Sequence, residues 1–278
     1  MDILDKKEVL RKIQTELKIS GMSKRTIQIY SDYNSKFLDF INKDPLEITK
    51  DDIKSYLAEI IDKNESSSVA LVTSALRYFY DGILEKGLML KIKTPKYHRK
   101  LPDVLTRQEI QLILDNSGSL RNKLLIELMY ASGLRVSEVA SLKVSEINIP
   151  EKKGHLKHGK GNKERFFITS NKLLKDLSNY LESRKMDTEY LFPGKTGHIK
   201  TRAIQRVIER VAIRSGIKKH VHCHGFRHAF ATHLLENGTD IRFIQELLGH
   251  INLQTTQFYT TIKEDTLRKV KSPLDEEK

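Results

Sequence analysis

Histidine and arginine are concentrated in one short stretch, HVHCHGFRHAFATHL, which runs from His220 to Leu234. It contains five histidines, one arginine, Arg227, and the only cysteine of the chain, Cys223. Side chains of these types bind metal ions, bind phosphate groups, or pack inside a histidine-rich helix. The three interpretations predict different chemistry.

Two of the histidines have the spacing of a metal site. His224 and His228 are four residues apart, so both side chains could lie on one face of a helix, as in zinc proteases. The protease motif has a glutamate directly after the first histidine, whereas this chain has Gly225 there. A zinc site would therefore need ligands from elsewhere, with Cys223 as one candidate, and it predicts an activity that a chelator abolishes.

The same stretch also has the pattern of a buried helix. Phe226, Phe230 and Leu234 recur every four residues and would form an apolar stripe. In this interpretation the histidines, among them His228 and His233, are packing residues.

A phosphate site is the third interpretation. His224 and Arg227 are three residues apart, so both can emerge on one side of a helix start, where free backbone N–H groups already favour an anion. The planar guanidinium matches the oxygens of a phosphate, and histidine can exchange a proton near neutral pH. The pair alone is weak evidence, but other segments carry residues of the same chemistry.

Three further segments supply such residues. The segment YASGLRVSEVASL places Arg135 just after a glycine that can end a helix, and GKGNKER places Lys160 in a predicted turn. The segment LLGHINLQTTQFY places His250 nine residues before Tyr259. Two histidines, two arginines, a lysine and a tyrosine are suited to reaction at a phosphodiester.

In order, wording and spacing, these six residues resemble the signature of the tyrosine recombinases, also called the phage integrase family. The segments GLRVSEV, GKGNKER, HGFRHAFATHLL and LLGHINLQTTQFY are closest to those of the Xer-type recombinases. The resemblance runs from about Leu105 to Thr260, and the N-terminal region agrees only in general character. Phe226 replaces the usual leucine, and His158 stands before the Gly–Lys turn where the family has an apolar or β-branched residue.

The resemblance implies strand cleavage by a tyrosine. A phenol with a pKa of about 10 is almost wholly protonated at neutral pH, so Tyr259 needs help to attack phosphorus. Arg135 and Arg227 would grip the two non-bridging oxygens, an interaction that strengthens as charge builds up in the transition state. The product would be a 3′-phosphotyrosyl link that conserves the bond energy for rejoining, without a metal ion, ATP or any other cofactor.

The other residues of the signature would move protons. By resemblance, Lys160 would protonate the leaving 5′ oxygen, and His224 would assist proton transfer at the tyrosine. His250 would donate to a phosphate oxygen, and Glu138, one turn after Arg135, would orient the cluster.

The elements that precede these residues are predicted to be helical. A helix starts after a cap at Ser23, a capping box at Thr49 and Asp52 opens a second, and a third spans Ser68–Glu85. The basic, proline-containing segment that follows predicts a linker. We therefore expect an N-terminal helical DNA-binding domain over residues 1–92, a linker over 93–103 and a catalytic domain over 104–278.

The second domain is expected to mix helices with one hairpin. Thr106 and Glu109 form another capping box, and a helix rich in leucine can close at Gly133. Two short segments flank a glycine-rich turn, and the second of them, Arg165–Thr169, is strand-like. The predicted fold is mainly α with a small β-hairpin or sheet in the catalytic domain, and the resemblance implies a two-domain, C-shaped DNA clamp.

Charge favours a polyanionic partner. The chain has 49 basic and 36 acidic residues, a net charge of +13, and most of the excess follows residue 98. Arginines recur every fourth residue from Arg202 to Arg214, opposite an apolar face, which suits either a solvated surface or phosphate contacts. The candidate DNA-binding residues are Lys93, Lys96, Arg99, Lys100, Lys163, Arg165, Arg202, Gln205 and Arg206.

The resemblance also implies assembly on DNA. We expect a tetramer that holds two duplexes at a specific recombination site and exchanges a C-terminal segment, with Glu264–Lys271 as the candidate. A helix folded back on its own domain is the alternative. The N-terminus alternates acids and bases, no run is long and apolar enough to span a membrane, and a single cysteine suits a reducing compartment, so we expect a cytoplasmic protein.

Xer-like chromosome dimer resolution is the function that the resemblance favours. A mobile-element integrase or a type IB topoisomerase would share the chemistry, and relaxation of supercoils at no particular site would indicate the topoisomerase. A non-catalytic DNA-binding protein that retains the fold would form no covalent adduct that depends on Tyr259.

Overall fold

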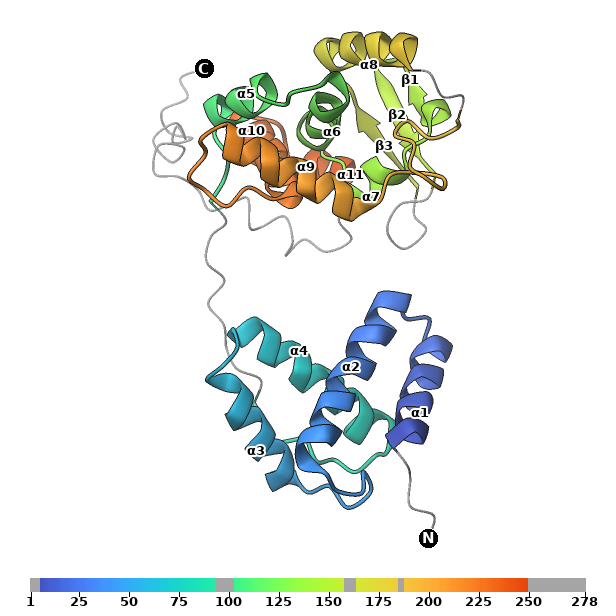
Figure 1. Ribbon diagram of the computed structural model, residues 1–278, viewed down its shortest axis with the longest axis vertical. Helices are drawn as coiled ribbons and strands as arrows, with labels where there is room; N and C mark the ends of the chain where they lie inside the picture. The colour runs from blue at the N-terminus through green and yellow to red at the C-terminus, as the bar shows by residue number, and fades with distance from the viewer. Residues whose placement is uncertain (1–5, 94–102, 158–163, 185–187, 250–278) are drawn as a thin grey trace, which may run out of the picture. The chain divides into compact units, whose positions relative to one another are not determined.

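The computed structural model describes residues 6–93, 103–157, 164–184 and 188–249 (Figure 1). The chain divides into two compact units, Met1–Lys100 and Leu101–Lys278. Nearly all of the predicted linker, 93–103, falls outside the described residues, and the predicted clamp concerns how the units sit on DNA. Both remain predictions.

The first unit consists of helices. Its elements are α1 (Lys6–Ile19), α2 (Lys24–Ile41), α3 (Lys50–Ile61), α4 (Ser66–Arg77) and a π-helical turn η1 (Tyr78–Ile83) that continues α4. The third predicted helix is therefore present, but it starts two residues earlier than expected and changes to π geometry for its last part. Helix α1, which packs against α2, was not predicted.

Local capping explains where two of these helices begin. The Ser23 hydroxyl accepts a hydrogen bond from the backbone N–H of Thr26 at 3.1 Å and so satisfies a free donor at the start of α2. At α3 the predicted capping box is present, because the Thr49 side chain accepts from the Asp52 N–H and the Asp52 carboxylate accepts from the Thr49 N–H. Both predicted starts are confirmed.

Aromatic side chains fill the centre of the first unit. Phe37 of α2 and Tyr80 of η1 are fully buried and meet edge to face, with ring centroids 5.9 Å apart. Ile13, Ile53 and Leu76 bring α1, α3 and α4 to the same cluster. The unit therefore has a hydrophobic core of its own.

The second unit combines helices with a small sheet. Its elements are α5 (Arg107–Asp115), α6 (Leu120–Ala131), α7 (Val136–Ser141), a 3-10 turn η2 (Val144–Glu146), β1 (Ile147–Asn148), β2 (Lys153–Leu156), β3 (Arg165–Ile168), α8 (Asn171–Ser183), α9 (Thr201–Arg214), α10 (Cys223–Glu236) and α11 (Ile241–Leu248). The strands are antiparallel in the order β1-β2-β3. The predicted mainly α fold with a small sheet is confirmed, although β1 was not predicted.

Helix α6 is the centre of this unit. Leu124, Leu125, Ile126, Leu128 and Met129 are all fully buried, so apolar residues surround the helix axis. Helices α8 and α10 both pack against α6 (Figure 1). Because α6 and α10 pack together, the residues that follow each helix in the chain are held in fixed positions relative to each other.

The sheet has one buried face and one exposed face. On β3, Arg165 and Phe167 point inward while Phe166 and Ile168 are exposed, as the two-residue period of a strand requires. Gly154 of β2 lies opposite Phe167, and a Cβ there would collide with the phenyl ring. This close packing sets the register that directs Arg165 into the interior.

The capping box predicted at Thr106 and Glu109 opens α5, with hydrogen bonds of 3.2 and 2.7 Å.

Among the described residues, no helix is both long and apolar enough to cross a membrane.

Candidate functional site

A glycine turn places Arg135 at the start of α7. Gly133 has a φ of +61°, which lets the chain leave α6 sharply, and a Cβ there would come within 2.6 Å of the Phe230 ring. The chain then enters α7 with Arg135 at the N-cap position. The turn itself therefore packs against α10, and the Arg135 guanidinium reaches the Leu248 carbonyl at the end of α11.

Glu138 binds Arg135 twice. Its carboxylate accepts a hydrogen bond of 2.8 Å from the Arg135 backbone N–H, which is half of a capping box, and one of 2.7 Å from the guanidinium. The same carboxylate is 2.6 Å from Arg165 Nη2 and 4.0 Å from Arg227 Nη1. Glu138, predicted to orient the cluster, thus lies among three guanidinium groups.

Electrostatics keep Glu138 ionised although only 5% of it is exposed. Burial alone would raise its pKa, but the charge of Arg165, the Arg135 N–H and the charge of Arg135 outweigh burial and lower the pKa below its ordinary value. With one ionised carboxylate among three guanidinium groups, the site keeps a net positive charge.

Arg227 is fully buried in the first turns of α10. Its guanidinium donates to the carbonyl oxygen of Gly133 at 2.6 Å and also to that of Leu248. A buried arginine has to be satisfied in this way, because an uncompensated buried charge is costly. These bonds tie α10 to the turn before Arg135 and to the end of α11.

The guanidinium groups of Arg135 and Arg227 converge on one oxygen atom. Arg135 Nη2 donates to the Leu248 carbonyl at 3.3 Å, and Arg227 Nη2 donates to the same carbonyl. Two forks that meet at one acceptor can bind an oxyanion from two sides. The structure therefore brings together the two arginines that the sequence predicted to act on one group.

His224 lies one turn before Arg227 and is accessible to solvent, although one side of its ring packs edge-on against His228 at 4.3 Å between centroids. Loss of solvation, followed by the charges of Arg227, His222 and Arg135, lowers the pKa of His224 below its ordinary 6.5. The imidazole is therefore mostly neutral at pH 7 and able to accept a proton.

Several predicted residues lie outside the part of the chain that the structure describes. They are the three catalytic candidates Lys160, His250 and Tyr259, the DNA-binding candidates Lys96, Arg99, Lys100 and Lys163, and the segment Glu264–Lys271. Their roles remain predictions.

Four of the DNA-binding candidates are accessible. Lys93, Arg202 and Arg206 are exposed, and Gln205 is half-buried. The last three lie in the first turns of α9, where Arg202 contacts Gln205 at 3.4 Å. The apolar face of α9 that was expected opposite the arginines is buried.

Arg165 was predicted to contact DNA, and the structure places it differently. Its side chain is 8% exposed, pairs with Glu138 and donates to the Leu247 carbonyl, so it is engaged inside the protein. Strand alternation explains the difference, because Arg165 shares the inner face of β3 with the buried Phe167. That alternation was visible in the sequence and could have identified Arg165 as a buried residue.

The other histidines of α10 are packing residues in part. His233 is buried, and its Nδ1 lies 3.0 Å from the Tyr130 hydroxyl. Cys223, Phe226 and Phe230 are buried as well. Among the residues that the structure describes, no group of three or more His, Cys, Asp or Glu side chains is arranged to hold a metal ion.

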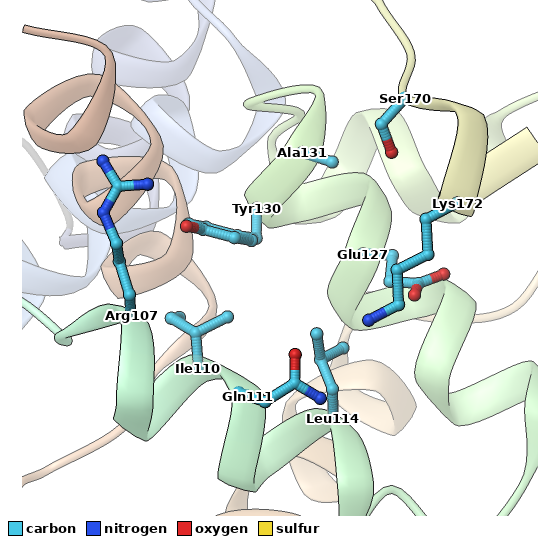
Figure 2. A pocket seen from close by; sticks show the side chains of 9 residues that line it. All are labelled: Arg107, Ile110, Gln111, Leu114, Glu127, Tyr130, Ala131, Ser170 and Lys172. Carbon is cyan, nitrogen blue, oxygen red and sulfur yellow. The ribbon is translucent and has the colours of Figure 1, made fainter. Parts of the chain in front are cut away.

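A pocket of about 230 Å³ lies between α5, α6 and the start of α8 (Figure 2). Figure 2 shows Arg107 on one side of it and Lys172 and Glu127 on the other. Arg107 donates to the His233 carbonyl and to Asn237, at the end of α10 opposite to His224. The pocket is therefore separate from the arginine cluster.

Glu127, at the edge of this pocket, is buried, and neither of its carboxylate oxygens has a hydrogen-bond partner among the described residues. Burial and the nearby charge of Asp176 raise its pKa to about 7, although Lys123 partly compensates from 3.9 Å.

Comparison with known proteins identifies relatives over most of the chain. Residues 103–265 match the phage integrase family, and residues 9–89 match the phage integrase N-terminal SAM-like domain. The chain is 38% identical over 266 residues to tyrosine recombinase XerA of Pyrococcus horikoshii, covering 94% of this chain and 91% of the relative. It is 34% identical to tyrosine recombinase XerD of Staphylococcus epidermidis, covering 95% of each chain.

Solved structures show the same fold. A crystal structure of XerA recombinase is 32% identical and covers 94% of this chain and 96% of its own, with a TM-score of 0.56. The XerH recombinase bound to its difH substrate before cleavage is 21% identical and covers 98% and 85%, with a TM-score of 0.76.

Proposed function

Because the chain belongs to the phage integrase family of DNA strand-exchanging enzymes, the tyrosine recombinases, we propose that it cuts and rejoins DNA at a specific site through a 3′-phosphotyrosyl intermediate. The observation that carries this proposal is the convergence of Arg135 and Arg227 on one oxygen atom, with Glu138 holding Arg135. A scissile phosphate brought to this point would be bound by both guanidinium groups. Its charge would then be neutralised where it increases during the reaction.

The proposed reaction moves one proton away from the nucleophile and one to the leaving group. The Tyr259 oxygen attacks phosphorus, the bond to the 5′ oxygen breaks, and the phosphate remains joined to the tyrosine. His224, which is exposed and has a lowered pKa, is suited to take the phenolic proton. Lys160 would give a proton to the 5′ oxygen, and His250 would donate to a non-bridging oxygen.

Double-stranded DNA is the proposed substrate. The solved relatives XerH and λ integrase are DNA complexes, and the exposed basic side chains of α9 could contact a duplex here. Arg202, Gln205 and Arg206 are the residues that we expect to reach it, together with Lys93 before the second unit. A cytoplasmic location and Xer-like resolution of chromosome dimers complete the proposal.

We propose a tetramer on two duplexes, with exchange of the segment Glu264–Lys271 between protomers. Truncation after Thr261 should weaken assembly of the synapse more than binding to a single site. Equal losses in the two measurements would contradict the exchange.

Covalent capture tests the chemistry. The protein is incubated with fragmented chromosomal DNA in excess chelator, and DNA that stays attached under denaturing conditions is sequenced. We expect adducts at one preferred sequence, and none with Tyr259→Phe. Adducts that persist in Tyr259→Phe, that need a metal ion, or that are absent with the unmodified protein would reject the proposal.

The captured sequence also distinguishes the related functions. One chromosomal site would support dimer resolution, whereas sites at the ends of a mobile element would indicate an integrase. Adducts spread over all sequences would indicate a topoisomerase. A nicked duplex that contains the preferred sequence then traps the intermediate for rate measurements, because the short strand diffuses away and rejoining stops.

A further inference from the structure

We propose that Arg165 is a positioning residue that, through Glu138 and the last carbonyl groups of α11, holds Arg135 and Arg227 in place for the scissile phosphate. This inference rests on the proposed function. It assigns to Arg165 an internal role in place of a contact with DNA.

Arg165 joins three segments of the second unit. Nη2 is 2.6 Å from Glu138 Oε2 in α7, and Nη1 donates to the Leu247 carbonyl at the end of α11, while the backbone belongs to β3. The next carbonyl along the chain, that of Leu248, accepts from both Arg135 and Arg227. Arg165 therefore fixes both supports on which the arginine pair depends.

The fit around Arg165 is tight. Gly249 has a φ of +60°, and a Cβ there would come within 2.8 Å of Arg165 Cδ. Only 8% of the Arg165 side chain is exposed. Such a site selects a side chain with two donors at a fixed angle, which arginine has and lysine lacks.

Loss of Arg165 would change the charge balance of the site. Glu138 has one buried carboxylate to share among three guanidinium groups, and the Arg165 charge is the largest influence that opposes the effect of burial on its pKa. Without Arg165, Glu138 loses its shortest contact and the Leu247 carbonyl loses its donor. The carboxylate and the end of α11 would then be free to shift, and the arginine pair with them.

Two substitutions test the role. Arg165→Gln removes the charge, and Arg165→Lys keeps the charge but cannot make both contacts. Lys153→Gln is the matched control, because Lys153 is a basic residue on the exposed face of the same sheet. Adduct formation in a single turnover at saturating enzyme, the Kd for the site and thermal unfolding are measured for each protein.

We expect Arg165→Gln and Arg165→Lys to slow adduct formation at least ten-fold, relative to the folded fraction, while the Kd changes less than about three-fold. The control should react at the wild-type rate. An unchanged rate, or a Kd that rises as much as the rate falls, would overturn the inference. If Arg165→Gln does not fold, Arg165→Lys carries the same comparison.

A modified substrate separates positioning from a general structural role. A methylphosphonate at the scissile position has no charge on its non-bridging atoms, so it needs the arginine pair less. The defect of Arg165→Gln should shrink at least ten-fold on this substrate, as that of Arg135→Ala should. A defect of equal size on both substrates would mean that Arg165 does not act through the arginine pair.

A second modified substrate tests whether Arg165 acts instead through Lys160, which precedes β3 in the sequence. A 5′-bridging sulfur leaves without needing a proton, so it should rescue Lys160→Ala. We expect it not to rescue Arg165→Gln, and rescue there would mean that Arg165 acts through Lys160. If the wild-type protein forms no adduct, the proposed function fails. If the wild type reacts and the Arg165 variants react equally fast, only the role of Arg165 fails.

Discussion

Arg135 and Arg227 donate to the same carbonyl oxygen, that of Leu248, although one precedes α7 and the other lies in α10. Arg227 is fully buried, whereas about a fifth of the Arg135 side chain is exposed, at 22%. The pair therefore has a fixed inner member and an outer member that is accessible to a substrate. In the protein without DNA, the Leu248 carbonyl at the end of α11 is the acceptor that holds both arginines.

Substitution of the outer arginine should affect chemistry more than folding. Arg135→Lys keeps a positive charge but loses the fork that reaches Glu138 and the shared oxygen together, so we expect adduct formation to fall by about 10²–10³, the range for loss of one transition-state donor. Thermal unfolding should change little. Arg227→Lys provides the comparison, because loss of its two buried hydrogen bonds should lower both the rate and the melting temperature.

Glu138→Gln should destabilise the protein at neutral pH. The substitution leaves three guanidinium groups without their shared carboxylate, and loss of one partner of a buried pair costs about 3–5 kcal/mol. The folded-state pKa of Glu138 is depressed, so its stabilising effect is present above the unfolded-state pKa of about 4.3 and is lost as the pH falls through the folded value. Urea unfolding at pH 7 and below pH 4 should show that the difference from wild type shrinks in acid. A constant difference would contradict this assignment.

Glu127→Gln should stabilise the protein at pH 8, in contrast to the destabilisation expected for Glu138→Gln. The pKa of Glu127 is raised from 4.5 to about 7, so the unfolded chain releases this proton first and stability falls as the pH rises between these values. Glutamine carries no charge at any pH, and we expect it to stabilise the protein by about 3 kcal/mol at pH 8 and to have little effect at pH 4. Denaturation at the two pH values checks the prediction. Destabilisation at pH 8 would show that the attraction between Glu127 and Lys123 outweighs burial and the charge of Asp176.

Gly133→Ala should displace Arg135. The φ of +61° strains any other residue, and the new Cβ would also collide with the Phe230 ring. Gly216→Ala is the control, because Gly216 has a φ of +66° but no other atom lies within 4 Å of the place that a Cβ would occupy. We expect about 1 kcal/mol of destabilisation for the control, from backbone strain, and about 1–3 kcal/mol more for Gly133→Ala, from overpacking. Only Gly133→Ala should slow adduct formation.

The rate of adduct formation should depend on His224 in its neutral form. Because its pKa is lowered below 6.5, the rate should remain constant from pH 8 down to below that value before it falls. The pH profile of the single-turnover rate, compared with that of His224→Gln, measures this. An acidic limb centred above pH 6.5 in the wild type would contradict a lowered pKa.

Local signals in the sequence were sufficient for much of the fold. The caps at Ser23, Thr49 and Thr106 involve residues within three positions of each other, so they are written in consecutive letters and can be recognised there. The same holds for the spacing of His224 and Arg227 on one helix and for the contact between Arg135 and Glu138. Helix α1 and strand β1 were missed, and β1 is only two residues long, too short for an alternating pattern to identify it.

The sequence by itself thus determined the composition of the site: which residues carry charge, which carry protons, and which local turns present them. The tertiary structure alone decided that Arg165 pairs with Glu138 and that two arginines share the Leu248 carbonyl. These contacts join β3, α7, α10 and α11, and they depend on backbone carbonyls, which every residue has and which no pattern of side chains identifies. Their partners are chosen by how α6 packs against its neighbours and by the register of β3, which are properties of the folded chain as a whole.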